Sequence, residues 1–200
     1  KLARDVYLTL GEIWNMQIFF NIADSEETHM NAVKPLLTTY GIEDPITTTE
    51  VGVFSDPDLA ALYNSLVEQG SASLTDALLV GATVEDLDIK DLQELLEETD
   101  KSDITFVYEN LLRGSENHIR SFTDLLSRSG VEYEAQFTDA EYLENLLGSD
   151  NARGQQPDVR QRYASGSRQL YGAAREGGER RQRDRDGHRA DGRYAVWRHA

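Results

Sequence analysis

The stretch NIADSEETHM, residues 21–30, places Glu26 and His29 on the apolar face of a helix predicted over residues 17–40. Residues three apart share a face of a helix, so these two side chains point the same way. That direction is the core, because the other residues on the face are hydrophobic. The stretch therefore predicts a core helix that carries a polar site. The hydrophobic residues of this face are Phe19, Ile22, Val33, Leu36 and Tyr40.

Two further predicted helices interrupt their apolar faces with pairs of polar residues at the same spacing. If these helices pair through the short turn near residue 100, the midpoints of their polar pairs lie about 14 and about 16 residues from that turn, a difference of ~3 Å in height. The polar side chains of three helices are therefore expected to meet in one layer of the core. The pairs are Glu85 and Asp88 in residues 72–98, and Ser115 and His118 in residues 104–129.

The rest of the first 150 residues completes a helical architecture. A helix over residues 1–14 carries Tyr7 on its apolar face, close to the polar layer, as a core residue or a redox-active one. Residues 41–55 have no helical period and predict a long crossover. The sequence thus predicts an all-α, four-helix bundle with short extra helices. These extra helices are predicted over residues 57–69, after Asp56-Pro57, and 139–147, with Thr138 and Glu141 as a capping box.

Charge divides the chain into two parts. Residues 1–150 hold 8 Lys and Arg against 30 Asp and Glu, whereas residues 151–200 hold 12 Arg, no Lys and 6 acids. The acidic part is expected to repel nucleic acid. The Arg- and Gly-rich part has few aliphatic residues and no period, so we predict a bundle over residues 1–147 and a disordered tail over 148–200. The sequence leaves open whether this tail binds nucleic acid or acidic surfaces, or is a disordered appendage or out-of-frame translated sequence.

The absence of cysteine and the burial of carboxylates narrow the chemistry of the polar layer. No Cys is present, which excludes disulfides and thiolate metal sites from this sequence. Burying unpaired carboxylates costs several kcal/mol each, and a bound cation removes that cost. Mixed oxygen and imidazole donors favour iron or manganese over zinc or calcium. A buried hydrogen-bond network that fixes the register of the bundle is the alternative.

The stretches KLARDVYLTL, NIADSEETHM, ALLVGATVEDLDIKDL and LLRGSENHIRSF resemble the ferritin-like, rubrerythrin-related four-helix proteins, specifically the family called domain of unknown function 2202. The ferritin-like pattern has one Glu from each of two helices and Glu-x-x-His from each of the other two. The resemblance implies that Glu26, His29, Glu85 and His118 are metal ligands, with Asp88 as a ligand or a hydrogen-bond acceptor. Ser115 stands where the pattern has a second bridging Glu. The first-helix Glu would fall before Lys1.

The function implied by this resemblance is that of a di-iron, or iron–manganese, carboxylate protein acting on dioxygen or peroxide as an oxidase or peroxidase. Its expected partners are a redox donor protein and a second copy of the chain in a homodimer. The alternative is a non-catalytic metal-binding bundle, or a metal-free structural or interaction bundle. No signal peptide or membrane span is recognisable, and the sequence leaves a cytoplasmic or exported location open.

Overall fold

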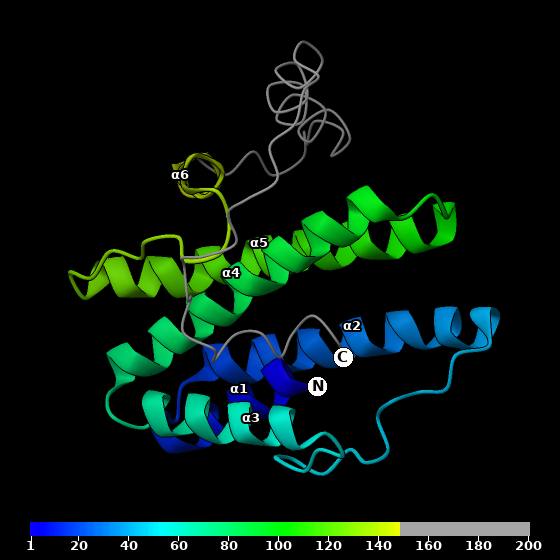
Figure 1. Cartoon of the computed structure of the whole chain (residues 1–200). Coiled ribbons are helices and arrows are strands. Elements are labelled where there is room, and N and C mark those ends of the chain that lie inside the picture. Colours follow the sequence, from blue (N-terminus) through cyan, green and yellow to red (C-terminus); the bar gives the residue numbers. More distant parts are fainter. Residues whose placement is uncertain (149–200) are drawn as a thin grey trace, which may run out of the picture. The chain divides into compact units, whose positions relative to one another are not determined.

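The computed structural model describes residues 1–148, and the regular structure of this part of the chain is all helix, without any strand (Figure 1). The prediction of an all-α protein is confirmed, and each predicted helix is present with bounds within two residues of those expected. The predicted disordered tail lies, apart from residue 148, outside the described residues. The helices are α1 (Leu2–Trp14), α2 (Gln17–Tyr40), α3 (Pro57–Gly70), α4 (Leu74–Glu98), α5 (Ser102–Arg128) and α6 (Ala140–Gly148).

The packing of the four helices α1, α2, α4 and α5 fits a four-helix bundle. α1 lies against α2 and α4, α5 lies against both α2 and α4, and the two shorter helices pack outside, α3 on α1 and α4, and α6 on α5. The predicted crossover, residues 41–55, leads from the end of α2 to α3 (Figure 1). The bundle places the middles of α2, α4 and α5 beside the start of α1.

Capping chemistry sets where α3 and α4 begin. The Asp56 carboxylate accepts hydrogen bonds from two backbone N–H groups of the first turn of α3, at 2.7 and 3.2 Å, and Pro57 occupies the first helical position. The Ser73 hydroxyl accepts from the N–H of Asp76, at 3.0 Å, and so caps α4. These side chains satisfy N–H groups that have no partner within the helix.

An aromatic cluster of Tyr7, Phe19 and Phe122 fills the core next to the polar layer. None of the three is exposed, and their ring centroids lie 5.5 to 6.3 Å apart. Gly81 allows α4 to approach this cluster, since a Cβ at that position would lie 2.6 Å from the Phe122 ring. The Tyr7 hydroxyl leaves the apolar cluster and donates to Glu85 at 2.7 Å. The aromatic core therefore supports one wall of the polar layer.

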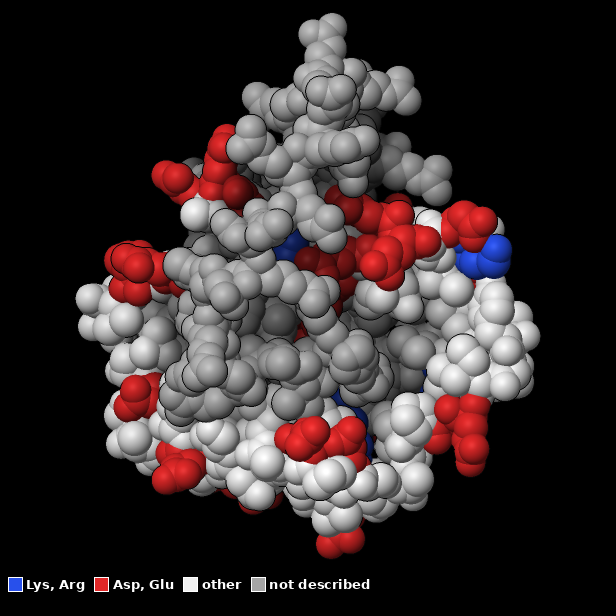
Figure 2. Space-filling view, in the orientation of Figure 1, with Lys and Arg blue, Asp and Glu red and all other residues white. Residues whose placement is uncertain are grey.

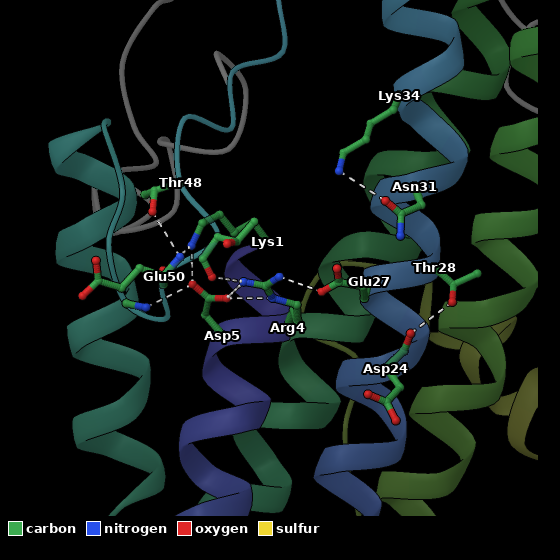
Figure 3. A network of polar contacts seen from close by, with 12 residues as sticks. Lys1, Arg4, Asp5, Asp24, Glu27, Thr28, Asn31, Lys34, Thr48 and Glu50 are labelled. Carbon is green, nitrogen blue, oxygen red and sulfur yellow. Dashed lines mark hydrogen bonds and ion pairs between the residues drawn. The ribbon is translucent and has the colours of Figure 1, made fainter.

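The crossover is fixed to α1 by a buried ion-pair network around Arg4 and Asp5 (Figure 3). The Arg4 guanidinium donates to Glu27 on α2 at 2.7 Å and to the carbonyl of Thr49 at 2.9 Å. The Asp5 carboxylate accepts from the N–H of Gly52 at 3.0 Å. Burial would lower the pKa of Arg4, but its contacts with Glu27 and Asp5 raise it. The charge of Arg4 is thus balanced within this network.

The segment that leads from α5 to α6 is fixed by Asp86, which is fully buried. Its carboxylate accepts from the Tyr133 hydroxyl and from the N–H groups of Gln136, Phe137 and Thr138, at 2.7 to 3.1 Å. The predicted capping box is wrong, because the Thr138 hydroxyl donates to Asp86 and Asp139 caps α6 instead. Neighbouring residues of α4 therefore serve two purposes, Glu85 facing the polar layer and Asp86 holding this segment.

Candidate metal centre

Three helices bring Glu26, Glu85 and His118 together in the core. Glu26 comes from α2, Glu85 from α4 and His118 from α5, and one ligand atom of each lies within 4.8 Å of those of the other two. The three residues are 7, 0 and 8 % exposed. Buried acidic and imidazole groups at this spacing are suited to a cation, whereas exposed acids at the same spacing are common without one.

Both imidazoles of the layer approach the same carboxylate oxygen. The Nδ1 atoms of His29 and His118 each lie 3.2 Å from Oε1 of Glu26, and the two rings stack with centroids 5.6 Å apart. Nδ1 of His118 also lies 3.3 Å from Oε2 of Glu85. The His118–Glu85 contact is a hydrogen bond, whereas the buried Oε1 of Glu26 has no hydrogen-bond partner among residues 1–148. A buried carboxylate oxygen between two imidazole nitrogens has the surroundings of a ligand atom.

The charges of Glu26 and His118 stabilise each other. Burial alone would raise the pKa of Glu26, but His118 and His29 outweigh it and lower the pKa to about 2. Burial alone would lower the pKa of His118, but Glu26 and Glu85 raise it to about 10. Without a cation, a protonated His118 therefore supplies positive charge to the layer.

The pKa values of the other two carboxyl groups of the layer, Glu85 and Asp88, are both raised. Burial raises the pKa of Glu85, and the charge of Glu26 adds to the effect. Burial also raises the pKa of Asp88 well above its usual value, followed by the charges of Glu85 and Glu26. Asp88 is partly exposed. Two of the three carboxyl groups of the layer thus have raised pKa values, and a multivalent cation bound here would stabilise their ionised forms.

The predicted residues divide into those that meet in the cluster and those beside it. Glu26, Glu85 and His118 form the cluster, His29 joins it through Glu26, and Asp88 lies close enough for its charge to interact with both glutamates. Ser115 is buried without a contact that links it to these residues. The expected site residues therefore share one region, with Ser115 the least connected.

Sequence reasoning missed one polar residue of the layer, Ser25. Its hydroxyl lies 2.9 Å from Nε2 of His118, on the side of the ring away from the carboxylates. Its position next to Glu26 could have indicated this role. A side chain beside the apolar face of α2 can still reach the His118 ring, which comes from α5. Tyr7, expected near the layer, does contact it through Glu85.

The comparisons with known proteins place this chain in a family. A family model described as "Uncharacterized protein domain (DUF2202)" matches residues 1–150. The chain belongs to this family. It is 53% identical over 154 residues to "Uncharacterized protein MJ0754" of Methanocaldococcus jannaschii, which covers 77% of this chain and 83% of that protein. The crystal structure of the hypothetical protein MJ0754 matches with a TM-score of 0.72, over 74% of this chain and 85% of that one.

The surface of this DUF2202 chain is acidic. Figure 2 shows acidic side chains across the visible face, with few Lys or Arg among the described residues, in line with the 30 acids and 8 basic residues of positions 1–150. Such a surface repels phosphate backbones. Within residues 1–148, no helix is both long and apolar enough to cross a bilayer.

Proposed function

We propose that this DUF2202 chain is a metalloprotein of ferritin-like type, with an iron or iron–manganese centre that acts on dioxygen or peroxide. The observation that carries the proposal is the buried cluster of Glu26, Glu85 and His118, in which Oε1 of Glu26 accepts no hydrogen bond from the residues of positions 1–148. Carboxylate and imidazole donors together suit iron and manganese. Glu26-x-x-His29 also matches the ferritin-like ligand pattern.

The residues of the layer divide the work of such a centre. Glu26, whose Oε1 lies 3.2 Å from both imidazoles, would hold the metal together with His29 and His118. Glu85 would be a further ligand, and Asp88 would add another carboxylate. When bound, iron would supply the electrons that reduce dioxygen or peroxide. The Tyr7 hydroxyl donates to Glu85 and holds this ligand in place. A redox donor protein would restore the reduced state, and a homodimer stays a prediction.

A metal-free structural bundle is the second candidate, and one observation favours it. The opposite pKa shifts of Glu26 and His118 give the layer an internal ion pair that needs no cation. Such a pair fixes the register of packed helices in some proteins. This reading leaves two carboxyl groups with raised pKa values and no cation beside them, the fully buried Glu85 and the partly exposed Asp88.

Iron binding and peroxide reaction together test the proposal. The whole chain is loaded with Fe²⁺ without oxygen, and its absorption spectrum is followed as one equivalent of hydrogen peroxide is added. A spectral change and peroxide loss that require bound iron are expected, and Glu85→Gln should remove both. Glu94→Gln is the matched control, because Glu94 is half-exposed on the same helix and pairs with Lys90. Iron binding without any reaction would leave a non-catalytic metal protein, and no binding would leave the structural bundle.

Gly114→Ala tests the part of His29 separately. A Cβ at Gly114 would lie 2.4 Å from Nε2 of His29, so the added methyl group must displace the ring. Alanine favours helix over glycine, so α5 should be retained. We expect the affinity for Mn²⁺, measured by electron paramagnetic resonance, to fall by about 10-fold, the lower end of what ligand-supporting changes cause. Gly148→Ala, where the added Cβ meets open space, is the control. Unchanged Mn²⁺ affinity in Gly114→Ala would mean that His29 is no ligand.

A further inference from the structure

Two adjacent residues of α2 contact both nitrogens of the His118 ring. Nδ1 lies 3.2 Å from Oε1 of Glu26, and Nε2 lies 2.9 Å from Oγ of Ser25. The ring enters from α5, so neither contact is imposed by its own helix. The contacts fix which nitrogen faces the carboxylates and which faces away.

The chemistry of imidazole gives the Ser25 contact a direction. A histidine that binds a cation through Nδ1 carries its remaining proton on Nε2, and that N–H needs an acceptor when it is buried. The Ser25 hydroxyl can accept it. When His118 is fully protonated, Nε2 also carries a proton, and Ser25 accepts in that state too. The same hydrogen bond therefore serves the cation-free and the cation-bound forms, without rotation of the ring.

His29 offers a contrast within the same layer. Its Nδ1 faces Glu26, but its Nε2 lies against Gly114, where α5 has no side chain. Nε2 of His118 is hydrogen-bonded to Ser25, whereas Nε2 of His29 has no hydroxyl or carboxylate partner among residues 1–148. The side chain of His29 is 16% exposed, against 10% for His118. The two imidazoles thus differ in how firmly they are held, and His118 is the better organised.

We propose that Ser25 is a positioning residue for metal binding, which orients His118 so that Nδ1 faces Glu26 and Glu85. This inference rests on the proposed metal centre. Outer partners of metal-binding histidines fix the tautomer and the ring orientation, and their loss costs about 10- to 100-fold in metal affinity. Ser25 therefore makes His118 the more firmly oriented of the two imidazoles.

Mn²⁺ affinity of four forms of the full chain tests this inference. Wild type, Ser25→Ala, Ser25→Thr and Thr28→Ala are titrated with Mn²⁺ and followed by electron paramagnetic resonance. Ser25→Ala should bind about 10- to 100-fold more weakly. Ser25→Thr keeps a hydroxyl and should restore most of the affinity. Thr28→Ala should match wild type, because the Thr28 hydroxyl is exposed and donates only to the carbonyl of Asp24 on its own helix.

A second measurement reports the hydrogen bond itself. In Zn²⁺-loaded protein labelled with ¹⁵N-histidine, the Nε2–H of His118 should give a slowly exchanging proton resonance that is lost in Ser25→Ala. Equal Mn²⁺ affinity of wild type and Ser25→Ala would overturn the role of Ser25 and leave the metal centre standing. Weaker binding with the Nε2–H resonance retained would likewise overturn it, in favour of a general packing effect. Absence of Mn²⁺ and Zn²⁺ binding by wild type would overturn the metal centre and this inference together.

Discussion

Replacing either Glu26 or His118 by alanine should abolish most metal binding, and replacing both should add little. The two residues come from different helices, yet their ligand atoms lie 3.2 Å apart and would hold the same ion. Removing one residue leaves an incomplete ligand set, so removing the second can weaken the remaining metal binding only a little. The effects of substitutions are not additive when the residues act as a unit. Each single change should weaken Fe²⁺ and Mn²⁺ binding by more than the ~100-fold that loss of a supporting partner causes.

The experiment compares the two single variants, the double variant and a matched control. Metal content after anaerobic loading and Mn²⁺ titrations give the affinities, and circular dichroism of the metal-free proteins shows whether the helices are retained. Glu26→Gln and His118→Gln serve where an alanine variant does not fold. Glu94→Ala removes an equal charge from a half-exposed position and should bind as wild type does. Losses that add in the double variant would mean that Glu26 and His118 hold separate ions.

The residues of the polar layer that lie on the apolar face of their helix could be predicted from the sequence. Glu26, Glu85 and His118 each interrupt a run of hydrophobic residues, and periodicity reports which face of a helix is buried. The short turn between α4 and α5 fixes the pairing of these two helices. Counting residues from that turn therefore places Glu85 and His118 at one height, and the structure has their side chains 3.3 Å apart.

Residues beside the apolar face could not be predicted in the same way. Ser25 comes directly before Glu26, and Asp86 comes directly after Glu85. Helical periodicity assigns such neighbouring positions to the side of the helix or to its solvated face. Asp86 is nevertheless fully buried, because the segment after α5 folds over it and donates three N–H and two O–H groups to its carboxylate. That contact depends on a loop about 50 residues away, and no local pattern reports it.

The positive charge that balances Glu26 in the polar layer could not be predicted from the sequence either. The apolar faces carry no Lys or Arg, which suggests that the carboxylates are unbalanced. In the structure Arg4 is buried, but its charge is balanced by Asp5 and Glu27. The balance for Glu26 comes from His118, whose pKa is raised to about 10 by distances that only the fold defines. A histidine in a sequence has no fixed charge, because its pKa depends on which groups surround it.

The free energy of unfolding of the metal-free protein should fall as the pH rises from 6.5 to about 10. His118 has a pKa of about 10 in the folded chain, against 6.5 in the unfolded chain, so the folded state binds the extra proton. Its contribution is complete below pH 6.5 and is lost as the pH rises through about 10. The raised pKa values of Glu85 and Asp88 act in the same direction from lower pH. Glu26, whose pKa is lowered to about 2, loses its contribution only in acid.

Bound metal should oppose this pH dependence. A metal ligand must be deprotonated, so binding releases the proton from His118, and those from Glu85 and Asp88 where these are protonated. The loaded protein then gains stability over the metal-free protein as the pH rises. At 1.36 kcal/mol per pKa unit, His118 can account for a loss of at most about 5 kcal/mol in the free energy of unfolding of the metal-free protein. Calorimetry of Mn²⁺ binding at pH 7, in buffers of different ionisation enthalpy, should show the release of at least about one proton.

Urea unfolding of wild type and of Glu26→Gln/His118→Gln, each from pH 6 to 9.5, isolates the contribution of the layer. The double variant keeps the size and polarity of the two side chains but has no titrating pair, so subtracting its curve removes the effect of surface Lys and Tyr groups. Wild type should lose stability relative to the double variant across this range when metal is removed by chelator, and should lose less with Mn²⁺ present. A difference that stays constant with pH would mean that His118 is neutral in the folded chain. Glu26 and His118 would then form no ion pair, and the contact that supports a metal-free bundle would be lost.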